Sequence, residues 1–155
     1  MELEQAQKLA NQIVKLISPF CERIVIAGSI RRKKPQSRDV DIVLIPKPLL
    51  WSRIISTLQK KMDAKVLKCG EKVSQLTIDG VNVDLYSATP ETWEPLLLIR
   101  TGSAEHNIKL SMRARKMGMK LTHSGLSKDG KIIASTEKEI FEALGMKYVP
   151  PEERK

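Results

Sequence analysis

An apolar run from Val40 to Ile45, opened by Asp39-Val40-Asp41, constrains the fold of this 155-residue chain more than any other feature. Its β-branched residues predict a strand, and Pro46 ends that strand. Successive side chains on a strand point to opposite faces of the sheet, so Asp39 and Asp41 share one face. The sequence therefore predicts a sheet with two neighbouring carboxylates on one of its faces.

Two carboxylates this close favour the binding of a cation. At ~5 Å and an effective dielectric constant of ~20 they repel each other by roughly 3 kcal/mol, and a divalent metal ion turns this repulsion into attraction. The upstream segment Gly28-Ser29-Ile30-Arg31-Arg32 supplies backbone N–H groups, a hydroxyl and positive charge. These are the groups that hold a polyphosphate.

Hydrophobic periodicity predicts a small sheet with two helices in the first 90 residues. Apolar residues at helical spacing predict one helix from Leu3 to Ile17 and another from Pro48 to Met62. Runs rich in β-branched residues predict strands at residues 23–27, 40–45, 65–68, 72–78 and 82–87.

After Thr89-Pro90 the pattern changes to helices with clustered positive charge, and we place a lobe boundary near residue 90. Short strands are predicted on either side of Ser124-Gly125 and Asp129-Gly130. Cap residues and spacing predict helices at residues 93–100, 103–117 and 136–144. The predicted fold class is α+β, in two lobes of residues 1–90 and 91–155.

A third carboxylate joins the first two. Alternation along Val81–Tyr86 places Val83 and Leu85 inward and Asp84 outward. Three carboxylates on a sheet, next to a phosphate-binding turn, are what two-metal phosphoryl transfer requires. Taken singly, an Asp-x-Asp pair or a Gly-Ser turn is more often solvated surface, but their ordered combination favours catalysis.

The charge of the chain narrows the class of partner. Lysine plus arginine outnumber the acidic residues by 27 to 18, for a net charge of +9, which favours nucleic acid as the partner.

Cys21 and Cys69 lie far apart in the sequence, which indicates reduced thiols rather than a disulfide. Reduced thiols fit an intracellular, cytoplasmic protein, nucleoid-associated in a prokaryote, and we expect a monomer. An acidic start and no bilayer-spanning apolar run predict no membrane contact.

A basic stripe is predicted on the helix that begins at Ser103. If the helical turn continues far enough, its members follow i, i+4, i+7 and i+11 spacing at Lys109, Arg113, Lys116 and Lys120, with Arg115 beside them. Such a stripe can follow a phosphate backbone, and we expect it to contact DNA. Read alone, the same pattern is more often a solvated helix face.

In these motifs, in Thr101-Gly102-Ser103 with Asn107, and in the tail from Thr136 to Pro151, the chain resembles the DNA polymerase X family of polymerase beta-like nucleotidyltransferases. The resemblance extends from Ile24 to Arg154. It implies a palm of mixed, mainly antiparallel sheet with helices on one face in residues 1–90. It implies a small α/β thumb in residues 91–155, with no lyase or helix-hairpin-helix domain.

The resemblance also implies roles for individual residues. Asp39 and Asp41 would ligate both of two Mg²⁺ ions, with Mn²⁺ as an alternative, and Asp84 would ligate one and help deprotonate the primer 3′-hydroxyl. The residues expected at the nucleotide are Gly28, Ser29, Arg32 and Ser37 at the phosphates, Thr101, Gly102 and Ser103 under the sugar, and Asn107 at the base. Arg38 either adds a triphosphate contact or points to solvent.

The implied function is DNA-templated DNA polymerisation, with transfer of a nucleotidyl group from a dNTP to a primer 3′-hydroxyl and release of pyrophosphate. The expected substrates are primer-template or gapped duplex DNA, in short-gap filling such as base excision repair. One alternative is a template-independent or non-DNA nucleotidyltransferase, and another is a catalytically silent DNA-binding module. Ile99-Arg100 stands where the family usually has an aromatic pair, which predicts weaker rejection of ribonucleotides.

Overall fold

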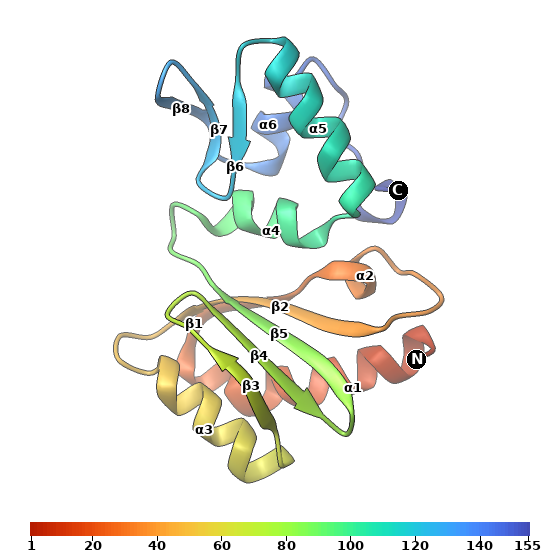
Figure 1. Cartoon of the computed structure of the whole chain (residues 1–155), viewed down its shortest axis with the longest axis vertical. Coiled ribbons are helices and arrows are strands. Elements are labelled where there is room, and N and C mark those ends of the chain that lie inside the picture. Colours follow the sequence, from red (N-terminus) through yellow and green to blue (C-terminus); the bar gives the residue numbers. More distant parts are fainter.

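A five-stranded sheet forms the centre of the first half of the chain, and a three-stranded sheet belongs to the second half (Figure 1). The structure is a computed structural model that describes residues 1–155. The strands of the larger sheet are β1 (Cys21–Ile26), β2 (Asp39–Pro46), β3 (Lys65–Cys69), β4 (Val73–Ile78) and β5 (Val81–Ser87). The ends of each observed strand lie within two residues of the ends predicted from the sequence.

The larger sheet has the strand order β1-β2-β5-β4-β3. Only β2 and β5 pair in parallel, and the other neighbours are antiparallel. This confirms the predicted α+β class with a mixed, mainly antiparallel sheet. The parallel pair matters for function, because β2 and β5 carry the three predicted acidic residues.

One face of the sheet is covered by α1 (Leu3–Ile17) and α3 (Trp51–Met62), as their apolar spacing predicts (Figure 1). These helices turn their apolar sides to the alternate residues of β2 and β5 that point away from the carboxylates. The fully buried side chains of this core include Ile13, Ile17, Ile42, Leu44, Ile54, Leu58 and Leu85.

The helix α4 (Trp93–Thr101) packs against the opposite face of the sheet, so helices are not confined to one face. The cause is visible in β2, where Val43 and Ile45 are buried as well as Ile42 and Leu44. A continuous apolar run needs cover on both faces. Tyr86, predicted to point outward, does lie on this second face, but α4 covers it and leaves it only 8% exposed.

The second lobe contains α5 (Ala104–Lys116), α6 (Glu137–Ala143) and the strands β6 (Lys120–Thr122), β7 (Gly125–Lys128) and β8 (Lys131–Ala134). Its core contains Leu110, Leu126 and Phe141, and it also takes in Leu98 of α4. The helix α4 thus contributes to both cores. No helix of the structure combines the length and the apolarity that crossing a bilayer requires.

A buried ion-pair network joins the two lobes. Glu137, the first residue of α6, accepts two hydrogen bonds from Arg31 of α2 (Gly28–Arg31), at 2.7 and 3.1 Å. It also pairs at 2.6 Å with Arg154, whose side chain is completely buried. Arg31 therefore holds α2 against the second lobe, and its charge does not face the predicted phosphate site.

This network predicts a dependence of stability on pH. Burial by itself raises the pKa of Glu137, but hydrogen bonds and positive charge from Arg31 and Arg154 outweigh it, so the pKa lies below its ordinary value of 4.5. The network therefore stabilises the fold above about pH 4.5, and this contribution declines as the pH falls toward the lower folded-state pKa.

Urea unfolding midpoints at pH 6 and pH 4 measure this effect. We expect the wild-type midpoint to fall more steeply with acid than that of Glu137→Gln, which has no charge to lose at this position. Equal changes in the two proteins would contradict the assignment.

Candidate active site

The three predicted acidic residues lie on one face of the sheet. In the parallel pair of β2 and β5, Asp41 is the register partner of Asp84, and Asp39 is the partner of Asn82. Paired residues on neighbouring strands lie about 4.8 Å apart and point to the same side. All three carboxylates are half-buried. The register therefore places Asp84 on the same face of the sheet as Asp39 and Asp41.

The three carboxylates carry negative charge that protein groups only partly offset. Burial, with the nearby charges of Asp84 and Asp39, raises the pKa of Asp41 from 3.8 to about 6, while Arg100 and Arg32 act in the opposite direction. Burial and the charge of Asp39 also raise the pKa of Asp84. A bound cation would relieve this repulsion, so the donor set fits divalent metal ions.

In the positions they occupy here, no three His, Cys, Asp or Glu side chains form a ready metal cluster. The shared face and the register, rather than the present distances between oxygens, are what support a metal site.

The glycine of the Gly-Ser motif allows the backbone to touch this cluster. Gly28 has φ of +60°, and a Cβ atom added to it would lie 2.2 Å from Oδ2 of Asp41. Glycine is therefore required both for the backbone angle and for the close approach. The predicted turn is in fact the short helix α2, which begins at Gly28.

Gly28→Ala is expected to lower nucleotide incorporation at least about 100-fold, because the new methyl group must displace the Asp41 carboxylate and misplace the site. Gly80→Ala is the matched control. Gly80 has a similar φ of +76°, but no atom lies within 4 Å of the Cβ position. Single-turnover incorporation by both variants checks this, and equal losses would mean that backbone strain alone is responsible.

A cavity of about 530 Å³ opens over the acidic residues. Ser29 donates a hydrogen bond to Ser37 at 2.9 Å, so the two hydroxyls lie together at its edge. Asp84 does not line the cavity but lies beside Asp41 on β5. The predicted site residues that do line it are Gly28, Ser29, Arg32, Ser37, Arg38, Asp39, Asp41, Gly102 and Asn107.

Two predicted nucleotide-binding side chains face away from the cavity. Thr101 is completely buried, where its hydroxyl donates to the carbonyl oxygen of Leu97 and accepts a hydrogen bond from Arg31. Ser103 caps α5, because its hydroxyl accepts from the backbone N–H of His106. Both hydroxyls therefore have partners within the protein, and the expected floor of Thr101, Gly102 and Ser103 under the sugar stays a prediction.

Between these two residues, Gly102 lines the cavity and stays close to Arg32. A Cβ atom on Gly102 would lie 2.9 Å from Nη1 of Arg32, and the same nitrogen donates to the carbonyl oxygen of Thr101. Arg32 is thus positioned by the backbone of the Thr101-Gly102-Ser103 segment. Its guanidinium lines the same cavity as Asp41.

Asn107 has a free acceptor at the cavity. Its Nδ2 donates to the carbonyl oxygen of Ile99 at 2.8 Å, which fixes the orientation of the amide. Its buried Oδ1 has no hydrogen-bond partner. A buried acceptor of this kind costs stability unless it is satisfied, so Asn107 is suited to a ligand donor.

The predicted basic stripe is interrupted. The helix α5 ends at Lys116, and Lys120 lies on β6. Arg113 donates to the carbonyl oxygens of Leu144 and Gly145, so it holds the end of α6. The continuous stripe was wrong because Gly118, with φ of +74°, ends the helical path. Three of the five predicted DNA-contacting residues remain free on α5, namely Lys109, Arg115 and Lys116.

Sequence reasoning assigned no role to the pair of Tyr86 and Arg100. The Arg100 guanidinium lies 4.2 Å from the centre of the Tyr86 ring, at the wall of the cavity. Its positive charge opposes the rise in pKa of both Asp41 and Asp84. One signal in the sequence could have pointed to this pair. Tyr86 lies two residues after Asp84, so strand alternation places both on the same face of the sheet.

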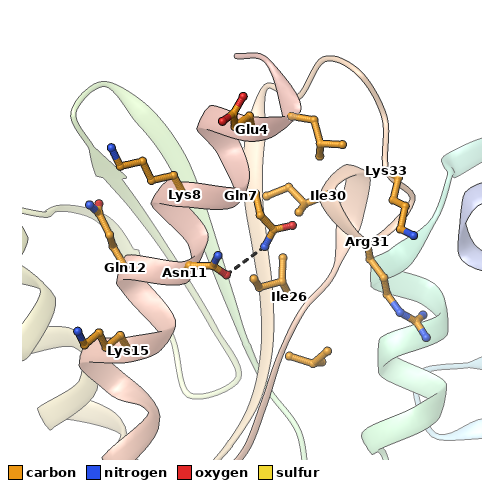
Figure 2. Close-up of a pocket in the computed structure, with 12 residues that line it drawn as sticks. Glu4, Gln7, Lys8, Asn11, Gln12, Lys15, Ile26, Ile30, Arg31 and Lys33 are labelled. Carbon is orange, nitrogen blue, oxygen red and sulfur yellow. Dashed lines mark hydrogen bonds between the residues drawn. The ribbon is translucent and has the colours of Figure 1, made fainter.

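A larger cavity of about 1210 Å³ lies elsewhere, along α1 (Figure 2). Its wall is made of lysine and amide side chains over an apolar floor, and Gln7 donates to Asn11 one turn further along α1. Glu4 is its only carboxylate, and none of the predicted site residues lines it. The smaller cavity over Asp41 is therefore the candidate active site, because chemistry rather than size distinguishes it.

The DNA polymerase beta thumb family matches residues 96–155 of the chain. Repair DNA polymerase X of African swine fever virus is 28% identical over 153 residues, which cover 93% of this chain and 86% of the relative. DNA polymerase/3'-5' exonuclease PolX of Bacillus subtilis is 27% identical over 161 residues, which cover 96% of this chain and 27% of the relative.

Among solved structures, the polymerase beta of Leishmania infantum, described as a ternary P/T complex, is similar in fold. The match has a TM-score of 0.85 at 20% sequence identity and covers 100% of this chain and 76% of that chain. Both lobes and their connection are therefore shared with that structure.

Proposed function

This chain belongs to the DNA polymerase X family, and from that premise we propose that it is a DNA-directed DNA polymerase that fills short gaps in DNA repair. The observation that supports this most strongly is the register of β2 and β5. It places three carboxylates on one face, beside a cavity that also holds Ser29, Arg32 and Asn107. Base excision repair is the pathway that we propose for it.

The three carboxylates have different proposed roles in nucleotidyl transfer. Asp39 and Asp41 would hold two Mg²⁺ or Mn²⁺ ions, and Asp84 would hold the ion at the primer end. Such ions supply activation of the attacking hydroxyl and neutralise charge on the leaving pyrophosphate. Asp84 would also receive the proton of the primer 3′-hydroxyl.

The triphosphate would be bound and oriented by hydrogen-bond donors that line the same cavity. The Ser29 and Ser37 hydroxyls, the backbone at Gly28 and the Arg32 guanidinium all lie there. Fixed hydrogen-bond donors and positive charge stabilise the developing charge of the phosphoryl groups. The Asn107 acceptor and the backbone at Gly102 then position the nucleoside.

The DNA is proposed to lie along the exposed positive side chains of α5. Lys109, Arg115 and Lys116 are exposed, and the chain has a net charge of +9. Contacts of this kind bind phosphates and not bases, so they fit primer-template or gapped duplex of any sequence. We propose that the protein acts on such DNA as a monomer inside the cell.

Single-turnover incorporation on a duplex with a one-nucleotide gap tests this function. With Mg²⁺ and four dNTPs, we expect addition of the nucleotide complementary to the template and release of pyrophosphate. Equal addition of all four nucleotides, or addition to blunt and single-stranded primers, would indicate a template-independent enzyme. DNA binding without any pyrophosphate release would indicate a silent DNA-binding module.

The wall formed by Ile99 and Arg100 predicts the response to ribonucleotides, because neither of these two positions carries an aromatic side chain. We expect wild-type protein to prefer dNTPs only weakly, and Ile99→Phe to strengthen that preference about 10-fold, because a bulkier wall of the pocket rejects a 2′-hydroxyl. Ile99→Leu, of similar volume, should leave the preference unchanged. Paired kinetics with a dNTP and its ribonucleotide measure this, and a strong preference in the wild type would contradict it.

A further inference from the structure

The large cavity along α1 opens onto an unpaired edge of the five-stranded sheet (Figure 2). The strand β1 is at one end of the order β1-β2-β5-β4-β3, so it has a neighbouring strand on one side only. Val25 and Ile26 of β1 line this cavity beside the flank of α1, and Ile30 and Arg31 of α2 also line it. We call this cavity the edge groove.

The backbone of β1 has free hydrogen-bonding groups at this edge. In the antiparallel pair of β1 and β2, the N–H of Ala27 donates to the carbonyl oxygen of Asp41 at 2.8 Å. Antiparallel strands exchange hydrogen bonds at every second residue, so the N–H and C=O groups of Ile24 and Ile26 point away from β2. No backbone contact from a turn or a loop uses these groups. An incoming strand can therefore bond to them.

This edge lacks the features that normally prevent pairing with another chain. Strand edges in soluble proteins are protected by charged residues, bulges or a covering element. The opposite edge strand, β3, has Lys65 and Lys68 and an irregular register next to Lys68. In β1, by contrast, Ile24, Val25 and Ile26 carry no charge, keep a regular register and are only half-buried. Such an edge is suited to pairing with a further strand.

The flank of α1 that lines the edge groove is as long as a strand. Its lining residues extend from Leu3 to Lys15 on one side of the helix, and a rise of 1.5 Å per residue gives them a length of about 18 Å. A strand of about six residues spans the same length. The edge groove can therefore accommodate an extended segment of that size.

The charges of the lining determine which segment fits. Apart from Glu4, every charged residue that lines the edge groove is basic. Arg31 and Lys33 are paired with glutamates of the second lobe, but Lys8 and Lys15 have no carboxylate oxygen within 4 Å. Positive side chains without a counter-charge complement the carboxylates of a partner.

The floor of the edge groove is apolar, which favours a peptide over DNA. Leu3, Ile26 and Ile30 line it, and Leu3 and Ile26 are partly buried against the core beneath α1. Apolar side chains of an added strand would extend this core, whereas DNA phosphates would contact only the lysines. A second copy of the chain fits less well, because it would bring the same lysines together in a protein with a net charge of +9.

We propose that the edge groove binds an extended acidic segment of a partner protein, which adds a strand to β1. Backbone hydrogen bonds to Ile24 and Ile26 hold the segment, its apolar side chains pack on the floor, and its carboxylates pair with Lys8 and Lys15. The inference goes beyond the proposed polymerase function and does not depend on it.

The edge groove lies apart from the active-site cavity. The short helix α2 separates the two, since Ile30 and Arg31 line the edge groove while Ser29 and Arg32 line the cavity over Asp41. A bound segment therefore leaves the carboxylates of the candidate active site open to substrate.

The test is equilibrium binding of a fluorescein-labelled peptide, Val-Thr-Glu-Thr-Val-Thr-Glu, followed by fluorescence anisotropy. Its valines and glutamates share one face of a strand, and its two glutamates are about 13 Å apart. This spacing suits Lys8 and Lys15, which are about 10.5 Å apart along α1. We expect saturable binding by the wild-type protein, at least about 10-fold tighter than binding of the peptide with glutamine in place of both glutamates.

Two N-methylated forms of the acidic peptide test the pairing with β1. Alternate N–H groups of a strand point to opposite edges, so methylation of the second, fourth and sixth residues blocks one edge, and methylation of the third, fifth and seventh blocks the other. We expect one form to bind at least about 10-fold more weakly than the unmodified peptide, and the other to stay within about 3-fold of it. Equal losses in both forms would overturn strand addition.

Lys8→Glu/Lys15→Glu protein tests the charges, and it should bind the acidic and the glutamine peptides equally. Lys60→Glu/Lys61→Glu protein is the matched control, because it carries the same change of charge on exposed residues of α3 outside the edge groove. The control should keep the wild-type preference. All four lysines are exposed, so both variants are expected to fold, and thermal melting checks this. The N-methylated peptides test the wild-type protein whatever the variants do.

Absence of saturable binding by the wild-type protein would overturn the proposal, as would the same loss of preference in both double variants. If Lys8→Glu/Lys15→Glu weakened binding of duplex DNA and not of the peptide, the groove would belong to nucleic acid instead. A wild-type dimer in sedimentation velocity that the acidic peptide dissociates would assign the groove to a second copy. Gap filling is measured separately, and its absence would contradict the polymerase function alone.

Discussion

Asp41→Asn protein is expected to lose nucleotide incorporation by about 1,000-fold or more while remaining folded. Asp41 is the register partner of Asp84 and touches the backbone at Gly28, so it would bind both metal ions. Loss of a carboxylate ligand removes several kcal/mol of transition-state stabilisation, and about 4 kcal/mol corresponds to a factor of 1,000. Single-turnover incorporation on gapped duplex measures the loss.

The same substitution should not lower stability. Burial and the charges of Asp84 and Asp39 raise the pKa of Asp41 to about 6, so its ionised form is held at a cost at neutral pH. Asparagine has nearly the same shape without the charge. We expect a thermal midpoint equal to or above that of wild type at pH 7, with the activity lost.

Asp79→Asn is the matched control, because Asp79 lies exposed in the turn between β4 and β5. Asparagine also tolerates its φ of +51°. This variant should keep wild-type incorporation. If Asp41→Asn incorporated nucleotides as fast as Asp79→Asn, the assignment of the metal ligands would be wrong.

Glu137→Ala is expected to destabilise the protein by about 3–5 kcal/mol, the largest stability effect that we predict. Arg154 is completely buried and pairs with Glu137 at 2.6 Å. Removal of one partner leaves the other charge buried without compensation, and this costs far more than the pair itself contributes. Arg31 loses both hydrogen bonds to the carboxylate at the same time.

Urea unfolding followed by circular dichroism measures this loss. Glu142→Ala, an exposed glutamate on the same helix, is the control and should change stability by less than about 0.5 kcal/mol. Glu137→Gln keeps hydrogen-bond acceptor capacity and should lie between the two. Similar midpoints for Glu137→Ala and Glu142→Ala would show that the network is not stabilising.

Local patterns were sufficient to predict most elements of the fold. The strands, the helices α1 and α3, and the shared face of Asp39 and Asp41 follow from apolar spacing, because burial of one face imposes its period on the sequence. The position of Asp84 beside Asp41 needed more than alternation. It depends on the parallel pairing of β2 with β5, which no local pattern specifies.

Side-chain roles that depend on partners far away in the sequence could not be predicted. Arg31 and Arg32 are neighbours in one motif, yet Arg31 pairs with Glu137 and Arg32 lines the cavity. Likewise, Thr101 is buried and Arg113 holds the end of α6. Each outcome depends on which donor or acceptor the tertiary fold brings within reach, and a single sequence does not contain that information.

The position of α4 limits how far the two lobes are modular. Its apolar side chains serve two interiors at once, with Trp93 and Leu97 against the sheet and Leu98 inside the second lobe. A chain cut near residue 90 would leave two fragments with exposed apolar surfaces. In the first fragment, Val43 and Ile45 would be exposed to water. The two halves of this enzyme are therefore not expected to fold independently. A chimera that exchanges one half should keep α4 compatible with the cores of both halves.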